Sequence, residues 1–201
     1  MNEPYKGKPY IGTYTGKHFH FLDPTEEEIC IEDIAQALSM NCRFSGHVSR
    51  FYSVAEHCCI IADLVEQAYK DKREVLSALL HDASEAYICD IPRPIKPHLD
   101  NYFDMELKIE NVIQSKYDIT AKTELIDYYD YHICGEEARQ LFLHKPDWVK
   151  EFDRVDNVKI HSWSPQVAKD EFLKRFDRLT GYVPTETPEE TEWFESMIKS
   201  A

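Results

Sequence analysis

The sequence predicts an all-α fold: a single helical bundle with a short hairpin at its N-terminus. Apolar residues recur at intervals of three and four along most of the chain after residue 30, which is typical of one face of an α-helix. Alternating strand patterns are almost absent. Of the 201 residues, 43% are hydrophobic and 30% are charged. This length and composition are typical of one globular domain of ordinary size. We therefore expect residues 1–201 to form one domain.

The start of the chain carries the best strand pattern. Residues 10–14 and 17–21 alternate polar and apolar side chains on either side of a Thr15-Gly16 turn, which predicts a short hairpin. The Asp23-Pro24 turn separates it from the first helix, whose apolar face is Ile31, Ile34, Ala35 and Leu38. Ser53-Val54-Ala55-Glu56 then fits a capping box at the start of a second helix. The apolar stripe of this helix is Val54, Cys58, Ile61, Val65 and Ala68.

Five more helices are predicted downstream, and prolines or caps mark several of their ends. A third helix is expected from about residue 73 to 87, before a loop with Pro92, Pro94 and Pro97. A fourth covers about 105–116, and a fifth covers 123–143 with Ile126, Ile133 and Leu141 on one face. A sixth, over 168–179, ends at Gly181. Thr187-Pro188-Glu189-Glu190 predicts the start of a last short helix, and we expect the helices of 146–199 to belong to the same domain.

Charge and apolar run length exclude several classes of protein. The chain has 23 basic and 37 acidic residues, a net charge of −14, which argues against binding to extended nucleic acid through a broad basic surface. A small anion is not excluded, because a metal ion or a local basic pocket overrides the net field. No apolar run has the length of a signal peptide or a membrane span. The six cysteines form no C-x-x-C pair, so we expect reduced core thiols in a cytoplasmic protein without a membrane partner.

His81-Asp82 lies in the middle of the predicted third helix, among apolar residues. Two ionisable groups in such a place are costly unless something pairs with them, and a divalent cation would do so. Imidazole and carboxylate form a standard mixed ligand set for Zn²⁺, Mn²⁺, Fe²⁺ or Co²⁺. Adjacent residues on a helix point about 100° apart, so the remaining ligands must come from other helices. An HD dipeptide alone is weak evidence, since such pairs are common.

Two further polar residues share apolar helix faces with core residues. His57 follows Val54 by three positions and precedes Ile61 by four, whereas Asp130 follows Ile126 by four and precedes Ile133 by three. Each alone is explained as a structural core residue. Four inward ionisable groups on three helices are better explained by a shared ion. Asp127 is the alternative to Asp130 as the fourth ionisable group, although the face of the helix on which it lies is less apolar.

Other charged residues lie close to these four along the chain. Glu85 follows His81 by one helical turn, on the same side, where it could activate a water or be merely exposed. The proline-rich loop presents Arg93 and Lys96, which suit phosphate oxygens or a solvated surface turn. The segment 42–52 interleaves basic residues with aromatics, as expected for phosphate binding with base stacking or for a loop anchored to helix ends. Its basic residues are Arg43, His47 and Arg50.

These motifs resemble the HD-domain phosphohydrolase superfamily in order and spacing. His57 ends CRFSGHVSRFYSVAEH, His81-Asp82 begins HDASEAYICDIPRPIK, and Asp130 lies in YDYHICGEEARQL. Together with IEDIAQALS, these stretches are similar to the small bacterial 5′-deoxynucleotidases. They are more similar still to phage enzymes that remove triphosphate from dATP, which would place the chain in the host cytoplasm if it is phage-encoded. The recognisable core is 30–142.

The resemblance implies an all-α HD domain that binds one divalent metal ion, Co²⁺, Mn²⁺ or Zn²⁺, through His57, His81, Asp82 and Asp130. It implies Glu85 and Lys96 as catalytic residues and a deoxynucleotide as the small-molecule substrate. The residues implied in substrate binding are Arg43, His47, Arg50, Arg93, Ile31 and Ile34. By resemblance the chain also forms a homo-oligomer.

The expected reaction is release of deoxyadenosine and triphosphate from dATP. Ser49 stands where a second basic residue is expected before Arg50, which weakens the case for a triphosphate over a monophosphate. A 5′-deoxynucleotidase acting on monophosphates, a phosphodiesterase and a non-catalytic nucleotide-binding HD protein remain as alternatives.

Overall fold

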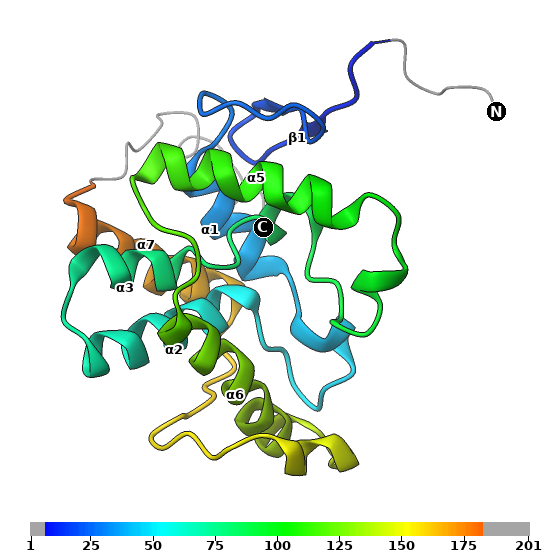
Figure 1. The fold of residues 1–201 in the computed structure, drawn as a ribbon, viewed down its shortest axis with the longest axis vertical. Helices are drawn as coiled ribbons and strands as arrows, with labels where there is room; N and C mark the ends of the chain where they lie inside the picture. Colours follow the sequence, from blue (N-terminus) through cyan, green and yellow to red (C-terminus); the bar gives the residue numbers. More distant parts are fainter. Residues whose placement is uncertain (1–6, 183–201) are drawn as a thin grey trace, which may run out of the picture.

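Helices carry almost all the regular structure of residues 7–182, the part of the chain that the computed structural model describes (Figure 1). The α-helices of this part are α1 (Ile31–Met40), α2 (Val54–Ala68), α3 (Lys72–Leu79), α4 (Glu85–Ile88), α5 (Tyr102–Tyr117), α6 (Glu124–Leu141) and α7 (Pro165–Thr180). Short 3₁₀ helices, η1 (Arg43–Gly46), η2 (Lys96–His98) and η3 (Asp147–Glu151), lie in the connections. The all-α prediction is confirmed. The helix predicted from Thr187 lies outside the described residues. Within them, no helix is long and apolar enough to cross a membrane.

The predicted hairpin is present, with shorter strands than expected. Strand β1 (Ile11–Gly12) pairs antiparallel with β2 (His18–Phe19), and Ile11 stands opposite Phe19. Asp33 of α1 holds its turn, since one carboxylate oxygen accepts from the Thr15 backbone N–H at 2.6 Å and the other from its hydroxyl at 2.9 Å. The hairpin is thus tied to α1 by a polar contact and by the fully buried Phe19.

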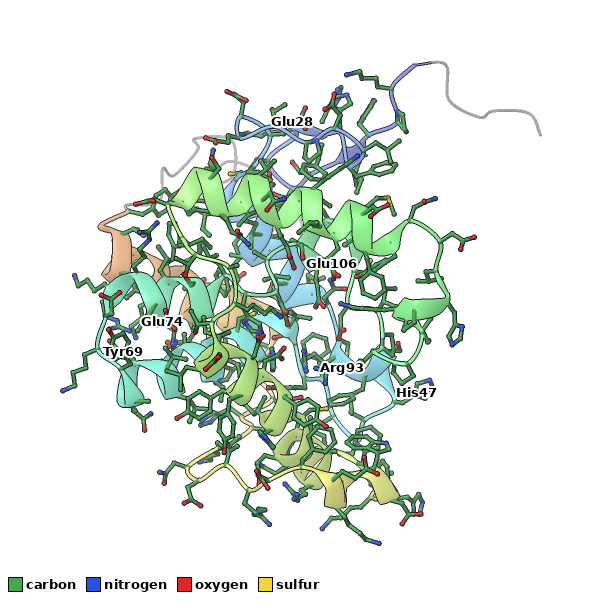
Figure 2. All side chains as sticks on the ribbon, viewed as in Figure 1. Glu28, His47, Tyr69, Glu74, Arg93 and Glu106 are labelled. Atoms are coloured by element: carbon green, nitrogen blue, oxygen red, sulfur yellow. The ribbon has the colours of Figure 1, made fainter. Side chains whose placement is uncertain are left out.

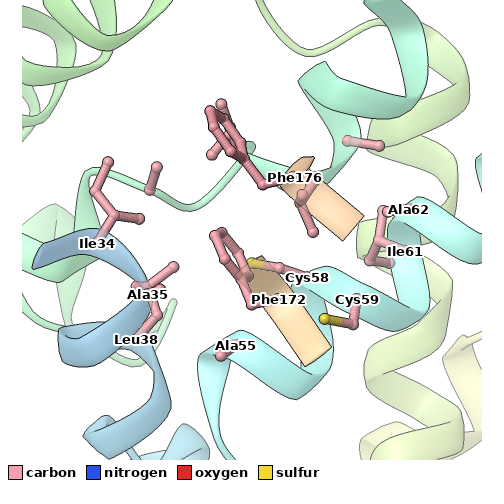
Figure 3. Packing of buried hydrophobic residues seen from close by; sticks show 14 of the residues in the cluster. Ile34, Ala35, Leu38, Ala55, Cys58, Cys59, Ile61, Ala62, Phe172 and Phe176 are labelled. Atoms are coloured by element: carbon pink, nitrogen blue, oxygen red, sulfur yellow. The ribbon is translucent and has the colours of Figure 1, made fainter. Parts of the chain in front are cut away.

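Helix α2 lies at the centre of the core and packs against α1, α3, α6 and α7. Figure 3 shows Phe172 and Phe176 of α7 on the side of that helix that faces α1, with Phe172 next to Cys58 of α2. These side chains belong to one hydrophobic cluster, in which Phe172 is 0% exposed. The prediction that the segment after residue 146 belongs to the same domain stays a prediction, and this packing of α7 supports it.

Replacing Phe172 with alanine is expected to lower the free energy of unfolding by about 3–5 kcal/mol, because a large cavity remains where the ring filled the space between three helices. Urea denaturation followed by circular dichroism measures it. Val167, on the exposed side of the same helix at 43% exposure, provides the control: Val167→Ala should change the free energy by less than about 0.5 kcal/mol. A Phe172→Ala loss below about 1 kcal/mol would contradict this description of the core.

The prediction of one continuous helix over residues 73–87 is wrong. Helix α3 ends at Leu79, a turn follows, and α4 begins at Glu85. In a continuing α-helix the carbonyl of Ala78 would accept from the N–H four residues later, that of Asp82. Here it accepts from Nδ1 of His81 at 2.7 Å instead. The side chain of His81 thus competes with the backbone, and the chain turns at the His81-Asp82 pair.

The capping box at α2 is only half formed. The hydroxyl of Ser53 accepts from the N–H of Glu56 at 3.1 Å, as predicted. The Glu56 carboxylate, however, accepts from three successive backbone N–H groups of another segment, those of His161, Ser162 and Trp163, at 2.6–3.0 Å. The segment before α7 is therefore fixed to the residue that precedes His57.

Candidate metal centre

Three elements bring four ionisable side chains to one place. His57 comes from α2, His81 and Asp82 from the turn between α3 and α4, and Asp130 from α6. One nitrogen or oxygen atom of each lies within 4.8 Å of the corresponding atom of every other. The Nε2 atoms of His57 and His81 are 3.3 Å apart, and Asp127, the competing residue on α6, is exposed.

The outer ring nitrogens of both histidines are already engaged. Nδ1 of His81 faces the carbonyl of Ala78, which can only accept, so this nitrogen carries the hydrogen. Nδ1 of His57 lies 2.6 Å from Oε1 of Glu137 and donates to that carboxylate. Both rings therefore direct Nε2 into the cluster.

The inward atoms of the cluster are ring nitrogens and carboxylate oxygens. Oδ2 of Asp82 lies 3.2 Å from Nε2 of His81, and Oδ1 of Asp130 lies 3.3 Å from Nε2 of His57. Two imidazole nitrogens and two carboxylate oxygens converge in a buried place, where they could hold a cation. Two imidazoles and two carboxylates suit Zn²⁺, Mn²⁺ or Co²⁺, and histidines held through Nδ1 are the usual arrangement in metal sites. The residues thus fit a divalent ion.

Sequence reasoning missed Glu137, which lies in the same row of α6 as Ile133 and Asp130. Its side chain is fully buried. Besides His57, its Oε1 accepts from the Tyr52 hydroxyl at 2.8 Å, and its Oε2 accepts from Arg43 at 3.1 Å. Burial raises the pKa of Glu137, but Arg43 and His57 together hold it below the ordinary value. The row of apolar residues on α6 was a sequence signal sufficient to find it.

Removing this carboxylate is expected to destabilise the fold. Glu137→Ala should lower the free energy of unfolding by about 3–5 kcal/mol, because Arg43 and His57 keep their places in the interior without their common partner. Urea denaturation of the metal-free protein measures this. Glu136→Ala is the comparison variant. Glu136 stands at the neighbouring position of α6, is also buried and pairs with Arg139. A loss below about 1 kcal/mol for Glu137→Ala would show that the network contributes little.

Sequence reasoning also missed Lys122, which stands in the loop before α6 where no pattern singles it out. Its Nζ donates to Oδ1 of Asp82 at 3.1 Å and to Oδ2 of Asp130 at 3.3 Å. Burial raises the pKa of Asp130, yet Lys122 and the two histidines hold it well below its usual range. The carboxylates of Asp82 and Asp130 are therefore anionic, and Lys122 compensates part of their charge.

Glu85 begins α4 and lies beside the cluster, with its side chain 5% exposed. Its Oε1 is 3.5 Å from Nζ of Lys96, whereas its Oε2 is buried with no hydrogen-bond partner among residues 7–182. Burial and the carboxylates of Asp82 and Asp90 raise the pKa of Glu85 well above its ordinary value. A buried carboxylate oxygen without a partner is suited to accept a proton from a water.

The cations predicted to contact phosphate divide into two groups. Arg43 reaches the cluster, 3.8 Å from Asp82, and Lys96 reaches Glu85 and lies 2.8 Å from Glu106 of α5. His47, Arg50 and Arg93 are exposed, and Figure 2 shows His47 at the edge of the molecule. Arg50 donates to the carbonyl of Ile160 at 3.3 Å, and the Arg93 guanidinium lies 5.3 Å from the ring centre of Tyr131.

Ile31 and Ile34, expected to border a base pocket, belong to the hydrophobic core with 3% and 0% exposure. No contact shows whether they border a base, so their role in substrate binding stays a prediction.

Comparison with known proteins gives the family. The model of the family described as YfbR-like 5′-deoxynucleotidase matches residues 38–194. The chain belongs to the YfbR-like 5′-deoxynucleotidase family. The resemblance to HD-domain phosphohydrolases is thereby confirmed, and the chain is a metal-dependent phosphohydrolase of this superfamily.

Three relatives illustrate the range of similarity. The chain is 36% identical to uncharacterized protein YfdR of Escherichia coli K12, over 85% of this chain and 96% of that one. It is 32% identical to uncharacterized protein RCAP_rcc00048 of Rhodobacter capsulatus, over 53% of this chain and 57% of that one. It is 30% identical to 5′-deoxynucleotidase Ent638_2835 of Enterobacter sp. strain 638, over 61% of this chain and 60% of that one. Of these three, the relative aligned over most of this chain carries no activity in its name.

Proposed function

We propose that the chain is a 5′-deoxynucleotidase that hydrolyses deoxynucleoside 5′-monophosphates to a deoxynucleoside and inorganic phosphate. The observation that carries this proposal is the position of Glu85, whose buried Oε2 without a partner lies beside four convergent metal-ligand side chains. The name of the Enterobacter relative supports the same substrate class. Mn²⁺, Co²⁺ and Zn²⁺ are the ions that the donor set favours.

The ion would be held by His57, His81, Asp82 and Asp130. When bound, it supplies Lewis-acid charge for a phosphate oxygen and lowers the pKa of a water. This chemistry requires no serine or cysteine nucleophile.

The chain's own residues supply the remaining chemistry. Oε2 of Glu85 accepts a proton from the attacking water, whose oxygen forms the new bond to phosphorus while the bond to the 5′-oxygen breaks. The 5′-oxygen leaves with a proton from solvent, and Glu85 returns its own proton to solvent, so that deoxynucleoside and phosphate are the products. Lys96, beside Glu85, and Arg43, beside Asp82, lie where they neutralise the phosphate oxygens.

The sequence-based expectation of dATP as substrate rests on resemblance to phage enzymes alone. Three of the basic residues offered for phosphate contacts, His47, Arg50 and Arg93, are exposed rather than gathered at the cluster. Arg43 and Lys96, the two cations beside the cluster, match one phosphate group better than the three phosphate groups of dATP. Homo-oligomer formation and a cytoplasmic location also remain predictions.

A substrate panel tests the proposal. Deoxynucleoside mono- and triphosphates and the matching ribonucleoside monophosphates are incubated with Mn²⁺ or Co²⁺, and the products are separated by chromatography. We expect deoxynucleoside and phosphate from the deoxy monophosphates, with slower turnover of the ribonucleotides. Release of intact triphosphate from dATP with no action on monophosphates would overturn the proposal. Binding without hydrolysis would overturn it too, in favour of a nucleotide sensor.

A further inference from the structure

Lys122 contacts the outward oxygens of the two carboxylates in the cluster. Its Nζ bonds Oδ1 of Asp82 and Oδ2 of Asp130. The other oxygens of the same carboxylates, Oδ2 of Asp82 and Oδ1 of Asp130, are the ones that face the imidazoles. One ammonium group thus bridges both carboxylates on their outer side and turns their inner oxygens toward the common centre.

Among the lysines and arginines of residues 7–182, Lys122 makes the closest contacts with Asp82 and Asp130. Arg43 comes only to 3.8 Å from Asp82, and its closer contact, at 3.1 Å, is with Glu137. Within residues 7–182, Lys122 is the one lysine or arginine paired with both Asp82 and Asp130.

We propose that Lys122 is the resident counter-ion of the cluster, which keeps the two carboxylates assembled without metal and weakens the binding of a divalent ion by placing a positive charge beside it. Like charges at this distance repel even where solvent screens them partly. The second half of this inference rests on the proposed metal site, and the first half does not. A residue that only oriented the ligands would have the opposite effect on ion affinity, since its loss would weaken binding.

The surroundings of Lys122 leave room for a substitution. A cavity of about 250 Å³ is lined by Lys122 and His81 together with polar side chains of α3, the following turn, α5 and the 119–122 loop. The polar members are Ser77, Ser84, Glu110, Gln114 and Thr120. Lys122→Met keeps the length of the side chain and removes its charge, and the cavity gives solvent a route to the freed carboxylate oxygens.

The test compares Lys122→Met with wild type, with Lys122→Arg, which keeps the charge, and with Lys174→Met, which removes an exposed lysine paired only with Glu171. Thermal unfolding of the metal-stripped proteins is measured first. We expect Lys122→Met to lower the midpoint by at least about 3 °C, because two charged hydrogen bonds are lost. Titration calorimetry with Mn²⁺ follows, where we expect Lys122→Met to bind about 10-fold more tightly than wild type. Lys122→Arg and Lys174→Met should stay within about 2-fold.

An unchanged midpoint for metal-stripped Lys122→Met, or weaker binding of Mn²⁺, would overturn the inference. Absence of Mn²⁺ binding by the wild type would instead remove the metal from the proposed function, and the melting comparison would still decide whether Lys122 stabilises the metal-free cluster. Should Lys122→Met fail to fold, Lys122→Gln makes the same comparison, because it keeps hydrogen-bond donors and removes the charge.

Discussion

Asp82→Ala is expected to lose bound divalent metal and deoxynucleotide hydrolysis together. Asp82 offers its inner oxygen to the common centre and its outer oxygen to Lys122, so its removal takes one ligand and frees a positive charge beside the others. We expect activity to fall by about 10³-fold or more, beyond the 10–100-fold that is typical when only an orienting partner of a ligand is lost. Metal content by atomic absorption and phosphate release are measured on the same preparations. His81→Ala is expected to behave in the same way.

Asp127→Ala serves as the control for this substitution. Asp127 is an exposed carboxylate on α6, three residues from Asp130, and its loss should leave metal content and turnover within about 2-fold of wild type. Full hydrolysis by a metal-stripped Asp82→Ala protein would refute the assignment of the cluster to catalysis.

Glu85→Gln is expected to keep the metal and lose turnover. The amide has nearly the shape of the carboxylate but cannot take a proton, and positioned proton transfer contributes about 10²–10⁴-fold to such reactions. We therefore expect kcat to fall by that factor while metal content stays the same. The comparison separates Glu85 from Asp82, for which metal and activity are lost together.

Glu110→Gln is the matched control on α5, because Glu110 is a half-buried carboxylate that lines the neighbouring cavity and has no hydrogen bond or ion pair with Glu85 or Lys96 within residues 7–182. It should keep kcat within about 3-fold of wild type. Unchanged turnover in Glu85→Gln would move the proton-accepting role to another residue.

Helix periodicity predicted most of the fold because one face of each long helix is buried in a single core. Ile126 and Ile133 of α6 and Phe172 of α7 are all fully buried, as their spacing indicated. The same reasoning placed His57 and Asp130 inside, since a polar residue on an apolar stripe points where its neighbours point.

Periodicity failed where side chains compete with the backbone or come from loops. The His81 ring takes the Ala78 carbonyl, and nothing in the apolar pattern of residues 73–87 signals that the helix stops there. Glu56 looked like a local cap but binds a segment more than 100 residues away, from His161 to Trp163. Lys122 reaches the cluster from a loop, whose path depends on the whole fold. Glu137, by contrast, lay in the apolar row of α6 and was predictable.

One ion held jointly by α2, the turn after α3 and α6 is central to the proposed function. The most direct test is an anomalous difference map from crystals of the protein soaked in Mn²⁺. We expect one strong peak per chain at coordination distance, about 2.0–2.2 Å, from His57, His81, Asp82 and Asp130 together. A peak elsewhere, or none among these four side chains at a concentration of Mn²⁺ that supports hydrolysis, would contradict it.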